Sequence, residues 1–182
     1  PESPGGAPTP PSSPKRGPRP AGAVPAEVRV GQGFDVHPFS GDPSRPLVLG
    51  GAVLNGERGL TGHSDADVIA HAVADAILGA AGLGDLGLHF PDTDAAWAGA
   101  DSLAILRRVR DLAAAQGWRV GNVDCTVVLE APKLAPHRAE MARRLEEAAG
   151  APVSVKATRA EGLGAIGRGE GVACWAVVLL DR

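Results

Sequence analysis

The sequence of 182 residues contains no tyrosine and only three phenylalanines and three tryptophans. Proteins that bind single-stranded nucleic acid commonly stack the bases on aromatic side chains, so this composition argues against such a surface. The formal net charge is −3, and an acidic chain does not attract the phosphates of a nucleic-acid backbone. Nucleic acid is therefore not an expected partner, and any phosphate group must be bound by local donors or by a metal ion.

Cysteines and long apolar runs are also scarce. The two cysteines, Cys125 and Cys174, lie in apolar segments with strand character, which predicts buried thiols and a reducing compartment. No apolar stretch approaches the roughly 20 residues of a membrane span, and the N-terminal segment lacks the apolar core of a signal peptide. We therefore expect a soluble, intracellular protein with no membrane partner.

Proline is concentrated at the N-terminus, where residues 1–25 hold nine of the 16 prolines. Such a segment cannot bury enough apolar surface to offset the entropy lost on ordering, so residues 1–26 are predicted to be a disordered linker or tail. Apolar patterning starts at residue 27. The remaining length suits one core and is too short for two, so we predict a single domain over residues 27–182.

Periodicity predicts the elements of that domain. Apolar, β-branched runs predict strands over residues 28–36, 46–54, 120–129, 153–157 and 172–180. Helical spacing predicts helices over residues 68–80, 102–116 and 136–150, the first capped by Ser64 or Asp65 and the second by Asp101. Because strands both precede and follow the helices, we expect an α+β fold, with a single mixed β-sheet and helices packed on one face.

Four of the five histidines lie within residues 37–89, among many aspartates. Alternation along the first strand places Asp35 and His37 on one face and turns Val36 to the core. On the first helix His71 lies on a polar stripe and could reach that pair. Two imidazoles and a carboxylate with an open fourth position are typical of catalytic zinc, so we predict Asp35, His37 and His71 as metal ligands.

The other members of the helical stripe are Asp67 and Asp75, each four residues from His71. Either carboxylate could accept a hydrogen bond from a ligand histidine and fix its tautomer. The alternative is that the whole stripe is a solvated helix face with no ligand.

Two further segments could bind phosphate. Residues 62–65 precede the first helix, whose free N–H groups and dipole suit an anion, although Ser64 could instead act only as the cap. Ser64 has no partners for a nucleophilic triad, so covalent catalysis is not expected. Residues 162–171 contain five glycines and Arg168, which would allow close backbone approach and a forked contact to phosphate. A glycine-rich hairpin with a surface arginine is the alternative.

Five motifs together resemble the 2-C-methyl-D-erythritol 2,4-cyclodiphosphate synthases: GFDVHPF (33–39), GHSDADVIAHAVADAILGAAGLGDLGLHFPDTD (62–94), ADS (100–102), GNVDCTVVLEAPKLAPH (121–137) and GRGEGVAC (167–174). The resemblance implies a phosphorus–oxygen lyase of the non-mevalonate isoprenoid pathway. Its substrate, 4-diphosphocytidyl-2-C-methyl-D-erythritol 2-phosphate, is converted to the cyclic diphosphate and CMP. The resemblance also implies zinc, a second divalent cation (magnesium or manganese), and a homotrimer with active sites between subunits. It further implies fusion to, or association with, the pathway's cytidylyltransferase, and a location in the bacterial cytoplasm or, for a plant or alga, in the plastid stroma.

The resemblance also assigns roles by position. Asp35, His37 and His71 match the zinc ligands, Glu161 matches the ligand of the second cation, and His63 and Ser64 match phosphate contacts. The methylerythritol group is matched by Asp85, Leu86, Gly87, Phe90, Pro91, Asp92, Thr93 and Asp94. The cytidine pocket is matched by Leu129, Glu130, Ala131, Pro132, Lys133, Leu134 and Ala135. Further substrate contacts are implied for Val36, Thr158, Arg159, Ala160, Ala165 and Arg168, and Arg168 and Glu170 match residues near the threefold axis.

Two positions depart from the family pattern. Arg159 stands where a threonine is usual, and Ala165 stands where an aromatic side chain is common. Arg159 could supply charge to the diphosphate, in which case it is catalytic together with His63, or it could crowd the site. In the implied reaction a substrate phosphate attacks the β-phosphorus, so no protein nucleophile is needed. A metal-dependent phosphohydrolase and a non-catalytic zinc-binding interaction module remain the alternatives.

Overall fold

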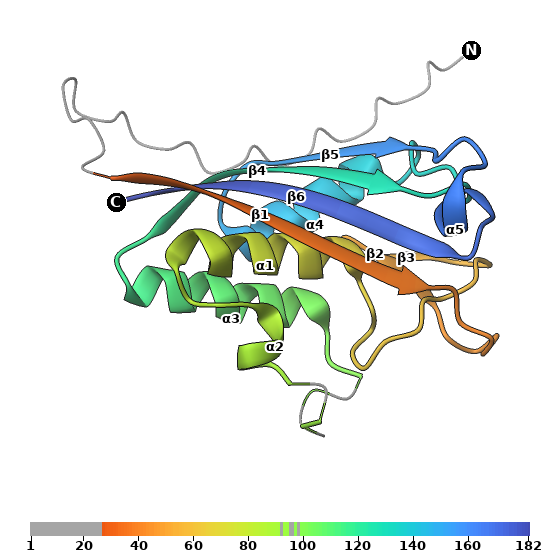
Figure 1. Cartoon of the computed structure of the whole chain (residues 1–182), viewed down its shortest axis with the longest axis horizontal. Coiled ribbons are helices and arrows are strands. Elements are labelled where there is room, and N and C mark those ends of the chain that lie inside the picture. The colour runs from red at the N-terminus through yellow and green to blue at the C-terminus, as the bar shows by residue number, and fades with distance from the viewer. Residues whose placement is uncertain (1–26, 92, 95–96, 98) are drawn as a thin grey trace, which may run out of the picture.

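The structure is a computed structural model that describes residues 27–91, 93–94, 97 and 99–182. Its main sheet has four strands in the order β1-β6-β4-β5 (Figure 1). These strands are β1 (Val28–Pro38), β4 (Arg119–Val128), β5 (Val153–Thr158) and β6 (Gly171–Asp181). Strand β6 is antiparallel to both β1 and β4, whereas β4 and β5 are parallel, so the sheet is mixed as predicted.

The helices cover one face of this sheet (Figure 1). Helix α1 (Val68–Ala81) contacts β1 and β6, α4 (Arg138–Ala149) packs on β5, and α3 (Ser102–Ala115) packs against both helices. The predicted α+β class, with a mixed sheet covered on one face, is therefore confirmed. None of the helices in the described part of the chain is long and apolar enough to cross a membrane.

Some details differ from the prediction. The expected strand over residues 46–54 is a hairpin of β2 (Leu47–Leu49) and β3 (Ala52–Leu54), which forms a separate two-stranded sheet, so a single sheet was wrong. The chain turns at Gly50 and Gly51, both with positive φ, which glycine adopts without steric cost. Two short helices, α2 (Leu86–His89) and α5 (Gly164–Gly167), were not predicted, because four residues are too few to show helical periodicity.

Helix α1 lies unusually close to β1. A Cβ atom placed at Gly33 would lie 2.0 Å from the carbonyl oxygen of Ala72, and one at Gly31 would lie 2.0 Å from that of Ala76. Only glycine fits at these two positions, and small alanines complete the contact on the helix. This close packing brings residue 71 of the helix within reach of residues 35 and 37 of the strand.

Among the described residues, no helix covers the opposite face of the sheet, which carries exposed apolar side chains. Phe34 and Trp175 are cross-strand partners there, with ring centroids 4.7 Å apart. Val36 lies on this face with its side chain 46% exposed, so the expectation that it turns to the core was wrong. The core lies on the glycine side of β1, where α1 packs. Both cysteines are buried and unpaired, as predicted.

Candidate active site

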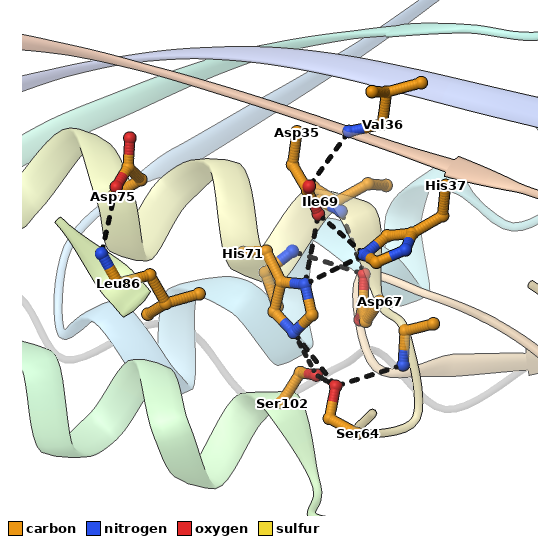
Figure 2. Close-up of polar contacts among 12 residues, drawn as sticks. Asp35, Val36, His37, Ser64, Asp67, Ile69, His71, Asp75, Leu86 and Ser102 are labelled. Atoms are coloured by element: carbon orange, nitrogen blue, oxygen red, sulfur yellow. Dashed lines mark hydrogen bonds and ion pairs between the residues drawn. The ribbon is translucent and has the colours of Figure 1, made fainter. Parts of the chain in front are cut away.

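Asp35, His37 and His71 converge on one point beneath β1 (Figure 2). Asp35 Oδ2 lies 3.0 Å from His37 Nε2 and 3.0 Å from His71 Nδ1, and the two nitrogens are 3.3 Å apart. Ligands of a tetrahedral zinc ion with bonds of about 2.0–2.1 Å are separated by roughly 3.3 Å. The donor atoms therefore fit a single metal ion. Among the described residues, these three side chains form the group that could hold one.

The nitrogen of each imidazole that faces away from this point has its own partner. His37 Nδ1 is 2.8 Å from the carbonyl oxygen of Thr61, which can only accept, so Nδ1 carries the proton and Nε2 keeps a lone pair. His71 Nε2 lies 2.9 Å from Ser102 Oγ and 3.1 Å from Ser64 Oγ. Both rings are therefore oriented before any metal arrives.

The charges of the cluster reinforce one another. Burial raises the pKa of Asp35, but hydrogen bonds from His37 and His71 outweigh it and hold that pKa well below its usual range. Burial lowers the pKa of His37, but the hydrogen bond and charge of Asp35 outweigh it and raise that pKa. The carboxylate therefore stays ionised at neutral pH, which suits a cation.

The two aspartates expected to fix a histidine tautomer act elsewhere. Asp67, not Ser64 or Asp65, is the N-cap of α1, and it is fully buried. Its carboxylate accepts hydrogen bonds from the backbone N–H groups of Gly50, Gly51, Ile69 and Ala70. Burial and the nearby Asp65 raise the pKa of Asp67 to about 6. Asp75 accepts from the N–H of Leu86 at 3.1 Å. Neither carboxylate hydrogen-bonds a ligand histidine.

The capping by Asp67 also changes the expected phosphate site. Because its carboxylate occupies N–H groups of the first helical turn, those groups are not free to bind an anion. His63 is exposed and Ser64 is buried, and both line a cavity next to the cluster. Arg45 donates to the carbonyl oxygens of Gly62 and Ser64 and so holds this loop in place.

The cavity has a volume of about 500 Å³. His37 and His71 form its metal end, and an apolar wall is formed by Leu86, Gly87, Phe90, Pro91, Trp97 and Ile105. Four of the residues matched to methylerythritol therefore line it. Asp85 instead caps α2 by accepting from the N–H of Leu88 at 2.9 Å, and Thr93 and Asp94 are exposed outside the lining. Asp92 lies outside the described residues.

The remaining candidates gather at the end of β4 and β5. The loop after β4 buries Leu129 and Leu134 and exposes Ala131, Lys133 and Ala135, with Pro132 half-buried. Thr158, Arg159, Ala160 and Glu161 follow directly at the end of β5, and Ala165 is exposed in α5. Arg168 bonds Glu170 at 2.6 Å.

Glu130 holds this second group together. Its carboxylate accepts from Arg159 Nε at 2.9 Å, from the N–H of Ala160 at 2.9 Å and from that of Gly162 at 3.4 Å. The loop thus bridged contains Glu161 with a φ of 53°, which is uncommon outside glycine. Among the described residues, none of this second group lines the cavity beside the metal cluster.

Sequence reasoning overlooked three groups that contact the ligand histidines or support them: the Thr61 carbonyl, the Ser102 hydroxyl and the Asp65 carboxylate, which accepts from that hydroxyl. A backbone carbonyl leaves no trace in side-chain patterning. Ser102 is 31 residues from His71, and its only signal was its place in the ADS motif.

This chain resembles proteins of one known family. The profile of the YgbB family matches residues 28–181. A "Bifunctional enzyme IspD/IspF" of Anaeromyxobacter dehalogenans is 58% identical over 160 residues, which cover 86% of this chain and 41% of that protein. A "2-C-methyl-D-erythritol 2,4-cyclodiphosphate synthase" of Thiobacillus denitrificans is 54% identical over 159 residues, which cover 86% of this chain and 98% of that protein.

A solved structure also matches. It is described as "IspF (Plasmodium falciparum) CDP complex" and superposes with a TM-score of 0.73 at 33% identity, over 85% of this chain and 96% of that one. The chain spans less than half of the bifunctional relative and nearly all of the single-function relative. These findings confirm the resemblance, the enzyme class and the pathway predicted from the sequence.

Proposed function

The chain belongs to the YgbB family, that of the enzymes that make 2-C-methyl-D-erythritol 2,4-cyclodiphosphate, and we propose how its residues carry out that reaction. The 2-phosphate of 4-diphosphocytidyl-2-C-methyl-D-erythritol 2-phosphate forms a new P–O bond to the β-phosphorus. The bond from that phosphorus to the oxygen shared with the α-phosphate breaks, and CMP leaves with that oxygen. The metal cluster beside the cavity is the observation that carries this proposal.

Zinc is the proposed ion for Asp35, His37 and His71, because two imidazoles and one carboxylate form a typical catalytic zinc set. A bound divalent cation would neutralise charge on the phosphate oxygens and help align the two reacting groups. The chain itself supplies orientation. Each imidazole is held through its second nitrogen, so the ligand atoms face the cavity without reorganisation.

The second cation, magnesium or manganese, is assigned to Glu161. Mg²⁺ is commonly held by one or two carboxylates together with substrate phosphates, so a single exposed carboxylate suffices when the diphosphate is present. Arg159 lies two residues away, and its guanidinium can contact phosphate oxygens when it is released from Glu130.

The cavity is proposed to hold the methylerythritol group. Its apolar wall suits the carbon skeleton, and His63 and Ser64 in its lining can donate to the phosphates. No protein nucleophile is required, because the attacking oxygen belongs to the substrate. Holding the two phosphates together makes the step intramolecular and raises the effective concentration of the nucleophile.

Cytidine is assigned to the loop of residues 129–135, which follows β4 and is therefore not adjacent to β1, the strand that carries Asp35 and His37. Strand β6 lies between β1 and β4, so two strand spacings of about 4.8 Å separate β1 from β4 by about 10 Å. We propose that the loop of one subunit faces the metal cluster of another in a homotrimer. The exposed apolar face around Phe34 and Trp175 supports this, because surfaces of that kind commonly lie in interfaces.

A fused or associated cytidylyltransferase is proposed as the source of the cytidine diphosphate group. The Anaeromyxobacter relative is named as a bifunctional IspD/IspF enzyme, and this chain matches 41% of its length. Residues 1–26 would then be a linker between two activities, as their proline content predicts.

The experiment that tests this function supplies the full substrate with zinc and magnesium in ¹⁸O-labelled water. The cyclic diphosphate and CMP should form without label, because the substrate phosphate is the nucleophile. A substrate lacking the 2-phosphate should release almost no CMP. Incorporation of ¹⁸O, or rapid CMP release from the shortened substrate, would instead identify a phosphohydrolase. Zinc binding without any turnover would favour the non-catalytic interaction module.

A further inference from the structure

Ser102 and Asp65 form a polar pair behind the metal cluster, on the side of His71 away from Asp35. Ser102 is the first residue of α3 and its side chain is fully buried. Its hydroxyl lies 2.9 Å from His71 Nε2 and also bonds Asp65 Oδ1. The backbone N–H of Ser102 donates to the other oxygen of the same carboxylate at 3.2 Å.

The direction of these hydrogen bonds follows from Asp65. An ionised carboxylate only accepts, so the Ser102 hydroxyl must donate its proton to Asp65. The lone pairs of Ser102 Oγ then accept from His71, which places the imidazole proton on Nε2. His71 Nδ1 keeps its lone pair, and that is the nitrogen facing Asp35 and His37 (Figure 2).

We propose that Asp65 and Ser102 are positioning residues that fix the tautomer and ring orientation of His71 and thereby set the metal affinity of the site. The inference rests on the metal role proposed above for His71. The Asp65–Ser102 pair joins two segments of the chain, because the N–H of Asp65 also donates to the carbonyl oxygen of Ala100 at 3.1 Å. The start of α3 is thus fastened to the loop before α1, with the His71 ring between them.

Ser64 is a weaker candidate for the same role. Its hydroxyl is 3.1 Å from His71 Nε2, slightly farther than Ser102, and it already accepts from the N–H of Ala66 at 3.2 Å. Ser64 lines the cavity, whereas Ser102 does not appear in the lining among the described residues. Ser64 therefore remains assigned to the substrate and Ser102 to the metal ligand.

The test measures zinc affinity by competition with a chelator, together with the visible spectrum of the cobalt-loaded chain, which reports the coordination geometry. Loss of a side chain that hydrogen-bonds a metal ligand typically weakens metal binding by about 10- to 100-fold. Ser102→Ala should therefore lower zinc affinity by that factor and change the cobalt spectrum. Asp65→Ala should do the same. Asp65→Asn keeps one acceptor oxygen and should recover part of the loss.

Asp101→Ala is the matched control. Asp101 is the N-cap of the same helix and accepts from the N–H of Leu103 instead of bonding the cluster, so its loss should lower the thermal midpoint but leave zinc affinity and the cobalt spectrum unchanged. Should Ser102→Ala not fold, the decision falls to Asp65→Ala, whose side chain is only partly buried.

The outcomes separate this inference from the function on which it rests. A wild-type chain that binds no zinc would overturn the proposed metal role itself. A wild-type chain that binds zinc, with Ser102→Ala or Asp65→Ala binding equally well and showing the same cobalt spectrum, would overturn only the positioning role. The same loss of affinity in Asp101→Ala would also overturn it, because a destabilised α3 would then be the cause.

Discussion

The metal cluster and the loop around Glu130 differ in how the chain holds them. The cluster lies on a strand and a helix, and its side chains are mostly buried, with His71 12% exposed. Arg159 in the loop is 64% exposed and is held by one ion pair with Glu130. The first region is ready to bind before a ligand arrives, whereas the second is free to exchange its partners when phosphate arrives.

This difference has a chemical reason. A metal ion needs its donor atoms fixed within a few tenths of an ångström, and packed regular elements provide that precision. A diphosphate with a nucleoside must enter and its product must leave, which favours side chains on a loop that can release one partner for another. The following predictions test whether the two regions are separable.

Removing a metal ligand should have the largest effect. His71→Ala deletes one of three ligands and should lower zinc affinity by more than about 100-fold, beyond the loss of an outer partner. Activity should fall with it. Bound zinc is measured by elemental analysis after dialysis. His89→Ala is the control, since His89 bonds the Leu83 carbonyl oxygen at 2.8 Å and lies outside the cluster. Full zinc content in His71→Ala would refute the assignment.

Separating the proposed subunits should abolish turnover while sparing the metal. Trp175→Glu places a charge in the exposed apolar face beside Phe34, where burial against another copy would be unfavourable. Light scattering should show a monomer that still binds zinc. Val53→Glu, on the separate hairpin and exposed to a similar degree, should remain a trimer. A wild-type chain that is monomeric at micromolar concentration would contradict the trimer.

Loosening the loop should reduce turnover and leave zinc affinity unchanged. Glu130→Ala removes the acceptor for Arg159 and for two backbone N–H groups. Misplacing a substrate-positioning group can cost up to about 100-fold, so kcat/KM should fall by roughly 10- to 100-fold. Arg159→Ala keeps the hydrogen bonds from the backbone N–H groups to Glu130. Comparing the two variants therefore distinguishes the effect of the arginine charge from that of the loop conformation. A parallel loss of zinc in Glu130→Ala would show that the two regions are coupled.

The part of the site on regular elements was the part that the sequence could predict. Alternation placed Asp35 with His37, and helical spacing indicated that His71 could meet them. Alternation alone could not decide which face of β1 is covered, because Val36 and its neighbours are apolar while the covered face carries glycines. The identity of the α1 cap was also missed, since Asp67 is one of three acidic or hydroxyl residues within four positions.

The loop region and the supports of the cluster could not be predicted, because they depend on contacts between distant segments. Glu130 reaches a loop about 30 residues away, and Ser102 reaches His71 across 31 positions. No local period encodes such pairs. The family resemblance identified Glu130 and the ADS motif as members of a pattern, but it did not give their hydrogen-bond partners.

Lowering the pH should weaken zinc binding by the metal cluster. The raised pKa of His37 means that a proton competes with the metal at a higher pH than for an ordinary histidine. Zinc affinity should fall as the pH drops through that raised value, by about tenfold per pH unit for each displaced proton. The folding stability of the metal-free chain should change in the opposite direction to zinc affinity. The His37–Asp35 interaction stabilises it fully below about pH 6.5 and loses this contribution as the pH rises through the raised pKa.

Deleting residues 1–26 should have the smallest effect. The YgbB family profile starts at residue 28, and the composition of residues 1–26 offers no periodic apolar positions to bury. Glu27 must stay, because Arg29 and Arg182 both bond its carboxylate and connect the two ends of the domain. The truncated chain starting at residue 27 should match the full chain in thermal midpoint, zinc content and kcat/KM. A chain starting at residue 30 should have a lower midpoint, since it also loses the start of β1 and the Arg29 contact with Trp118. A lower midpoint already on deletion of residues 1–26 would place part of that segment in the folded domain.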